Sequence, residues 1–103
     1  MRTLLAAVST LALLGAAGGC ARRMPPHATA GDAERSNIAL ADLDKGRQLV
    51  VAKCGSRCHK PPLPTDHHAS EWPRALDEMA PRANINSMER QLIEQYLIAL
   101  SRP

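Results

Sequence analysis

The stretch Cys54-Gly55-Ser56-Arg57-Cys58-His59 is the part of this 103-residue chain around which the rest of the sequence is arranged. It places two thiols and an imidazole within one short segment, a combination that binds metal ions and iron cofactors. Three residues separate the cysteines, one more than in the usual C-x-x-C-H spacing. The flanking segments therefore decide how the motif is interpreted.

A helix is predicted over residues 43–53, directly before the motif, with Asp42 as its N-cap because a short carboxylate can accept the first free amides. Small and apolar residues recur here at spacings of three and four, which indicates one buried face: Leu43, Gly46, Leu49, Val50 and Cys54. Glycine costs about 1 kcal/mol relative to alanine inside a helix. Gly46 therefore predicts the close approach of another backbone or a bulky side chain.

The prolines of residues 60–70 favour an extended, stiff segment after the motif. A second helix is predicted from Glu71 to Met79 or Ala80, with Ser70 as N-cap, Pro73 in its first turn and Pro81 closing it. Its apolar face consists of Trp72, Ala75, Leu76 and Met79.

A third helix begins at Asn86, because Asn86 and Glu89 resemble a capping box. Its apolar stripe is formed by Leu92, Ile93, Tyr96, Leu97 and Leu100. No alternating strand pattern competes with these helices. The predicted fold is all-α, a small three-helix domain over residues 38–103.

The predicted domain is poor in aromatic residues, with one Trp, one Tyr and no Phe in the chain. Small domains bury proportionately little surface and are hard to stabilise through their own core. A large, flat, apolar cofactor at the centre would supply the missing core, as would oligomerisation.

The first nineteen residues are predicted to be an export signal, with Arg2 as a basic start followed by an apolar stretch. The small residues before Cys20 resemble a bacterial lipobox, which predicts lipidation of Cys20. An ordinary cleaved signal and a retained anchor are the alternatives. Residues 20–37 contain adjacent prolines and no apolar periodicity, so they are interpreted as a flexible tether.

The composition argues against two broad classes of function. The formal net charge is +3, and no basic run indicates nucleic-acid binding. No catalytic triad, phosphate-binding loop or spaced carboxylate pair is found, so enzymatic activity is not predicted, and no small-molecule substrate is identified.

From about Leu40 to Leu100 the order of features resembles the class I c-type cytochromes: a helix with Gly46, the cysteine pair with histidine, a proline-rich loop, and a last helix ending in Tyr96-Leu97. The spacing of Trp72 and Met79 resembles small bacterial members of this family. The resemblance implies one covalent haem c, and it implies that the first helix crosses the last near Tyr96.

By resemblance, Cys54 and Cys58 bind the two vinyl groups, His59 is the proximal iron ligand and Met79 is the sixth ligand. Both cysteines can reach the ring only if the longer loop bulges, which Gly55 and Ser56 favour, glycine because it tolerates positive φ. A single thioether and no covalent attachment are the alternatives. Other candidates for the sixth ligand are His67, His68 and Met88, and an absent sixth ligand would indicate gas binding.

The expected function is one-electron transfer in the bacterial cell envelope, on the periplasmic side of a membrane, with redox proteins as partners. The outer membrane is expected for a lipidated chain, and the soluble periplasm otherwise. Four basic residues near the motif indicate an acidic partner: Lys45, Lys53, Arg57 and Lys60.

Two interpretations without haem remain. The first is a copper or zinc lipoprotein that binds metal through Cys54, Cys58 and a pair from His59, His67 and His68. The second is a structural lipoprotein in which Cys54 and Cys58 form a disulfide.

Overall fold

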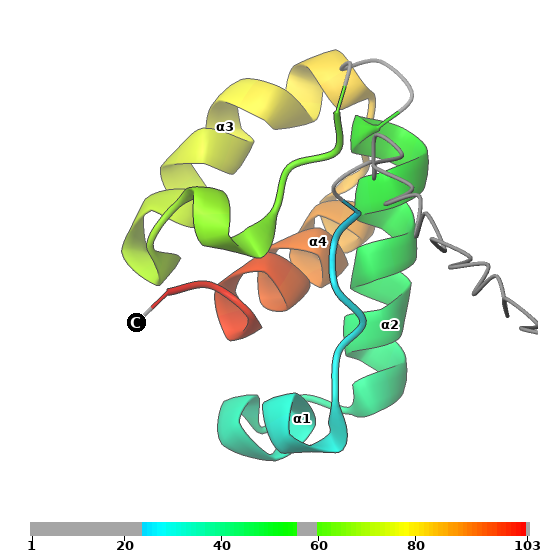
Figure 1. The fold of residues 1–103 in the computed structure, drawn as a ribbon. Helices are drawn as coiled ribbons and strands as arrows, with labels where there is room; N and C mark the ends of the chain where they lie inside the picture. The colour runs from blue at the N-terminus through cyan, green and yellow to red at the C-terminus, as the bar shows by residue number, and fades with distance from the viewer. Residues whose placement is uncertain (1–23, 56–59, 103) are drawn as a thin grey trace, which may run out of the picture.

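The computed structural model describes residues 24–55 and 60–102 of the chain. This part contains four α-helices, three short turns of other helix types and no strand (Figure 1). The α-helices are α1 (Ala30–Ser36), α2 (Leu40–Leu49), α3 (Trp72–Ala83) and α4 (Ser87–Ala99); the π-helical turn is η1 (Val50–Cys54), and the 3-10 turns are η2 (Pro64–Asp66) and η3 (Ala69–Glu71). The predicted all-α fold class is confirmed, and α1 is an additional helix.

Helix α2 packs against α4 (Figure 1). The two backbones are in direct contact at Gly46. A Cβ atom placed on Gly46 would lie 2.2 Å from the Leu92 carbonyl oxygen and 2.7 Å from Tyr96 Cβ. Both distances are far below van der Waals contact, so a side chain here would push the helices apart. The predicted close approach at Gly46 is confirmed, and the approaching element is the last helix near Tyr96.

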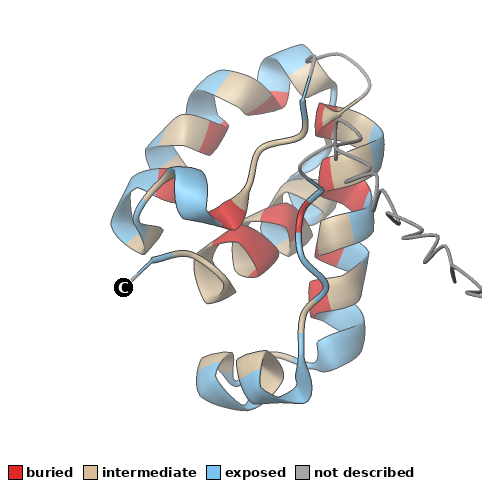
Figure 2. Cartoon of the chain, in the orientation of Figure 1, coloured by how far each residue is buried: buried red, intermediate tan, exposed pale blue. Residues whose placement is uncertain are grey.

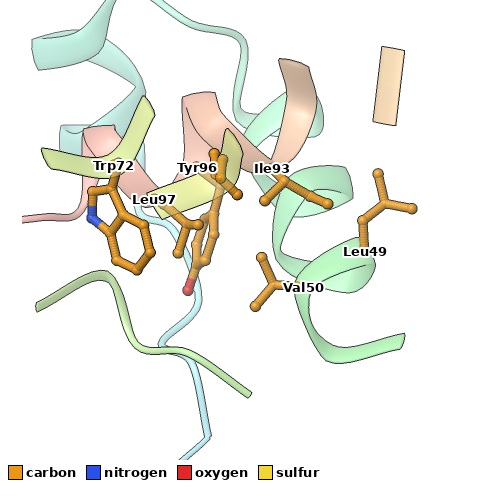
Figure 3. Close-up of a cluster of buried hydrophobic side chains, with 7 residues drawn as sticks. Leu49, Val50, Trp72, Ile93, Tyr96 and Leu97 are labelled. Carbon is orange, nitrogen blue, oxygen red and sulfur yellow. The ribbon is translucent and has the colours of Figure 1, made fainter. Parts of the chain in front are cut away.

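The core lies where α2, α3 and α4 meet (Figures 2 and 3). Its two aromatic rings, Trp72 and Tyr96, are both fully buried. The remaining members of the cluster are aliphatic: Leu49, Val50, Leu76, Ile93 and Leu97. The predicted inward faces of the three helices are therefore confirmed at their central positions.

The start of α4 matches its predicted capping box. The Glu89 N–H donates to Asn86 Oδ1 over 2.8 Å, and the Asn86 N–H donates to Glu89 Oε1 over 3.0 Å. Two amides that the helix leaves without intrahelical acceptors are satisfied in this way.

The start of α2 differs from the prediction. The helix begins three residues earlier, at Leu40, and its N-cap is Ala39, which offers no side-chain acceptor. Asp42 lies inside the first turn, where its negative charge is still favourable near the exposed amides. The assignment of Asp42 as N-cap is wrong, because the chain enters the helix directly from the turn that follows α1.

Helix α3 is also longer than predicted. It continues through Pro81 and ends at Ala83. Asn84 is its C-cap, with a left-handed φ of 53°. Proline lacks the N–H that would donate to the carbonyl four residues earlier, here that of the exposed Asp77, and its ring crowds that carbonyl, but the helix continues past it for two more residues. The prediction that Pro81 closes the helix is wrong, and the N-cap is Glu71 rather than Ser70.

Residues 24–29, which we call the N-terminal strap, run beside α2 before the chain turns into α1 (Figure 1). The side chain of Pro25 is fully buried. Arg47 Nε donates to the Pro25 carbonyl over 2.8 Å, and the Tyr96 hydroxyl donates to the Pro26 carbonyl over 2.5 Å. The strap is therefore bonded to both α2 and α4.

Helix α1 follows the strap and has a capping box of its own. The Asp32 N–H donates to Thr29 Oγ1 over 3.2 Å, and the Thr29 N–H donates to Asp32 Oδ2 over 2.8 Å. The backbone bond from Thr29 holds the pKa of Asp32 below its usual value. The interpretation of residues 20–37 as a flexible tether is wrong for residues 24–37, because local capping and the strap contacts order them; residues 20–23 lie outside the described part.

Candidate functional site

Cys54 is the first residue of the C-x3-C-H motif, and it ends the helical stretch formed by α2 and η1. Its side chain is buried, with the residue 5% exposed. In η1 the Gly55 N–H donates to the Val50 carbonyl over 3.1 Å, five residues back. A π turn holds more residues than an α turn, and such turns are frequent at functional sites. The motif, which has one extra residue between its cysteines, thus begins at the end of a helical stretch whose last turn is itself widened.

Gly55 has a different structural role from the one predicted. Its φ is −75°, in the ordinary right-handed region, so positive φ is not the reason for glycine here. A Cβ atom on Gly55 would lie 2.6 Å from the Val51 carbonyl oxygen and 3.4 Å from Pro61 Cβ. Glycine is needed for space, because the widened turn brings the Val51 carbonyl close to it.

Cys58 and His59 lie outside the described residues, as do Ser56, Arg57 and the predicted lipidation site Cys20. The bonding of both cysteines to one ring and the ligation by His59 therefore stay predictions. The described chain resumes at Lys60, and an extended stretch leads from there to η2.

Met79 lies on α3 and packs, partly buried, against the core cluster. Trp72 begins the same helix, and its indole Nε1 donates to the Pro64 carbonyl over 3.1 Å. This buried hydrogen bond fixes the proline-rich loop to the start of α3. The predicted sixth ligand is thus carried by a helix whose first residue is anchored to the loop that follows the motif.

The alternative sixth ligands differ in their surroundings. His67 contacts the edge of the Trp72 ring, with centroids 4.8 Å apart, and its Nδ1 lies 3.4 Å from Glu71 Oε2. His68 is exposed and forms an isolated backbone bridge with Arg102. Met88 is 72% exposed at the start of α4. Of the two methionines, only Met79 packs against the core cluster, and His67 reaches the same cluster through its contact with Trp72.

The predicted copper or zinc site combines described residues with two, Cys58 and His59, that lie outside the described part. Within residues 24–55 and 60–102, no group of three or more His, Cys, Asp and Glu side chains is arranged to hold a metal ion. The predicted copper or zinc set includes Cys58 and His59, so it stays a prediction as well.

The basic residues near the motif differ in their surroundings. Lys53 Nζ lies 3.6 Å from Glu89 Oε2 and joins the end of η1 to the start of α4. Such partly exposed pairs contribute about 0 to 1 kcal/mol. Lys45 and Lys60 are exposed, whereas Arg57 lies outside the described residues. The positive charge available to a partner here is therefore smaller than the sequence indicates.

A cavity of about 610 Å³ lies between α1 and α4. It is lined by residues such as Ile38, Gln91 and Ile98, and by none of the predicted haem-binding residues. Its three charged lining residues, Arg35, Arg90 and Glu94, already form ion pairs within the chain. The cavity is thus separate from the predicted chemistry.

Comparisons with known proteins found no protein-family model, curated protein or solved structure that matches the chain. None of the helices in residues 24–55 and 60–102 is long and apolar enough to span a bilayer.

Sequence reasoning missed two features of the site: the π-helical turn and the Pro64 carbonyl that holds Trp72. No pattern of residues in the sequence predicts the π-helical turn. The hydrogen bond of Trp72 could have been anticipated in part, because a buried indole N–H requires an acceptor.

Proposed function

We propose that this chain is a monohaem c-type cytochrome that carries single electrons in the bacterial cell envelope, held at the membrane by a lipid on Cys20. The observation that supports the proposal most is the contact of Gly46 with Leu92 and Tyr96. The resemblance to class I c-type cytochromes implies this crossing between the helix before the cysteine pair and the last helix. The crossing could have been absent, because Gly46 could have been a tolerated surface glycine.

The donor set also fits a covalently held haem. Cys54 supplies a buried thiol at a helix end, and Met79 supplies a thioether from a helix packed on the core. Cys58 and His59 supply the second thiol and the imidazole in sequence. One-electron exchange is the chemistry that a bound haem iron supplies.

The proposed roles of the residues follow from this set. Cys54 and Cys58 would hold the ring through thioether bonds, His59 would be the proximal ligand and Met79 the sixth ligand. Trp72, held by the Pro64 carbonyl, keeps the loop after the motif and the start of α3 in fixed positions. Redox partners would dock transiently over a small interface, as weak electron-transfer complexes do.

The proposal is tested by expressing the full chain in a bacterial periplasm together with a haem maturation system. After denaturation, haem should stay with the polypeptide, and Cys54→Ala and Cys58→Ala should each reduce the amount retained. Cys20→Ala is the matched control, because it removes a thiol outside the motif and should leave haem attachment unchanged. A colourless protein that holds copper or zinc would support the metal-binding alternative instead.

The sixth ligand is tested with two methionine variants in the oxidised holoprotein. Met79→Leu should remove the near-infrared band that arises from sulfur ligation of ferric haem, whereas Met88→Leu, at an exposed position, should keep it. Loss of the band in both variants, or in neither, contradicts the assignment. His67→Ala and His68→Ala then test the imidazole alternatives.

A further inference from the structure

The N-terminal strap holds the chain close to the domain immediately after the predicted lipidation site. Pro25 is fully buried, and the carbonyls of Pro25 and Pro26 accept hydrogen bonds from Arg47 and Tyr96. The strap is thus bonded to the two helices whose backbones are in close contact at Gly46.

The surroundings of the Tyr96 hydroxyl agree with a closely packed strap. Burial raises the pKa of Tyr96 to about 12, although the positive charge of Arg47 opposes the shift and the charge of Asp32 adds to it. Arg47 and Tyr96 both donate to strap carbonyls, so the strap closes over a pair of polar side chains that would otherwise need water.

Little chain is left between the strap and the predicted lipid. Ala21, Arg22, Arg23 and Met24 are the residues between Cys20 and the buried Pro25. A fully extended chain covers at most about 3.6 Å per residue, so these two positions are at most about 18 Å apart. A flexible tether up to residue 37 would have allowed a much larger separation.

We propose that the strap seats the domain directly on the phospholipid surface that carries lipidated Cys20, with the strap side of the domain toward the lipid. The inference rests on the lipidation of Cys20 in the proposed function. Two of the four residues that connect Cys20 to Pro25 in the sequence, Arg22 and Arg23, carry positive charge, which is complementary to anionic headgroups. A redox partner must then present its own site at the same membrane surface.

The test uses the full, processed chain reconstituted on a supported bilayer of phosphatidylethanolamine and phosphatidylglycerol. Neutron reflectometry measures where the protein layer begins relative to the headgroups. We expect the layer to begin at the headgroups without a hydrated gap. Insertion of about ten glycine and serine residues between Arg23 and Met24 should move its centre outward by roughly 15 to 20 Å, the mean span of such a linker.

A second pair of variants tests the strap itself. Arg47→Met combined with Tyr96→Phe removes both donors to the strap and should broaden the protein layer. Arg74→Met, at an exposed arginine on α3, is the matched control and should leave the layer unchanged. Circular dichroism of the double variant verifies folding, and the insertion variant tests the proposal even if the double variant unfolds.

The outcomes separate this inference from the proposed function. A hydrated gap beneath the unaltered chain, or the same layer position with and without the insertion, overturns the inference. A haem-containing protein that does not stay on the bilayer overturns it too, while leaving electron transfer in place. A colourless protein seated at the headgroups supports the inference and refutes the haem proposal.

Discussion

The α2–α4 and α3–α4 contacts are built in different ways. At the first, the backbones touch, and the Leu92 carbonyl occupies the space that a Cβ on Gly46 would need. At the second, side chains make the contact: Arg90 Nη2 on α4 donates to the Pro73 carbonyl over 3.1 Å and pairs with Asp77 over 2.7 Å. The first contact has a single geometry, whereas long side chains at the second can adjust.

This difference matters for the proposed site. Cys54 is carried by the helical stretch that crosses α4 at Gly46, and Met79 is carried by α3. The covalent attachment would therefore start from the backbone contact, and the sixth ligand would come from the side-chain contact.

Gly46→Ala should have the largest effect. The added methyl would overlap the Leu92 carbonyl and Tyr96 Cβ, so α2 and α4 must separate. We expect a loss of about 3 kcal/mol in the free energy of unfolding, at the upper end of the usual overpacking range. Chemical denaturation followed by circular dichroism measures it.

The matched control for this substitution is Gly31→Ala in α1. There the added Cβ would meet only Arg35 Nη1 at 3.4 Å and Thr29 Oγ1 at 3.6 Å. Helix propensity should then stabilise the protein by about 0.5 to 1 kcal/mol. Equal effects of the two substitutions would contradict a backbone contact at Gly46.

Trp72→Phe should come next. It removes the donor to the Pro64 carbonyl and leaves that buried acceptor without its indole partner. We expect a loss of about 2 kcal/mol in the free energy of unfolding. Denaturation followed by circular dichroism is suitable, because the variant lacks the only tryptophan of the sequence. A loss no larger than that of His67→Ala would mean that the hydrogen bond adds little.

Asn86→Ala should weaken the turn between α3 and α4 more modestly. It removes the acceptor for the Glu89 N–H at the start of α4. Loss of such a cap costs about 1 kcal/mol, or roughly 4 to 8 °C in Tm for a domain of this size. Calorimetry checks this value against Ser87→Ala, one residue further on at an exposed position, which should leave Tm nearly unchanged.

The ionisation of Tyr96 should have the smallest effect on the free energy of unfolding at neutral pH. In alkaline solution its effect should be distinct. Its pKa rises from the ordinary 10.0 to about 12 in the folded chain because the ring is buried. The folded state thus favours the neutral phenol; the resulting stability is complete below pH 10 and is lost as the pH rises toward 12. Ultraviolet titration of this lone tyrosine measures the shift, and a pKa near 10 in the folded protein would contradict it.

The sequence was sufficient to predict the elements in which apolar spacing and capping agree. The stripe through Ile93 and Tyr96 follows an Asn86–Glu89 capping box, and both features are found as predicted. Gly46 was informative because a glycine in a regular apolar face is costly without a packing reason. For the candidate site, sequence reasoning placed Cys54 at a buried helix end and Met79 on an inward face, and both placements are confirmed.

The remaining features depend on contacts that composition cannot reveal. The strap was interpreted as a linker because prolines and small residues are typical of linkers, yet its order comes from Arg47 and Tyr96, which lie far along the chain. The Thr29–Asp32 capping box was the local signal for α1. The widened turn before Gly55 and the continuation through Pro81 depend on the packing of the whole domain.

The hydrogen bond from Tyr96 to Pro26 joins residues 70 positions apart, and this separation has a consequence for biosynthesis. Chains are synthesised at about 5 to 20 residues per second, so Tyr96 is made roughly 4 to 14 seconds after Pro26. Until Tyr96 has been made, the Pro26 carbonyl lacks this hydrogen-bond donor. The strap therefore reaches its final position only after synthesis has proceeded into the last helix.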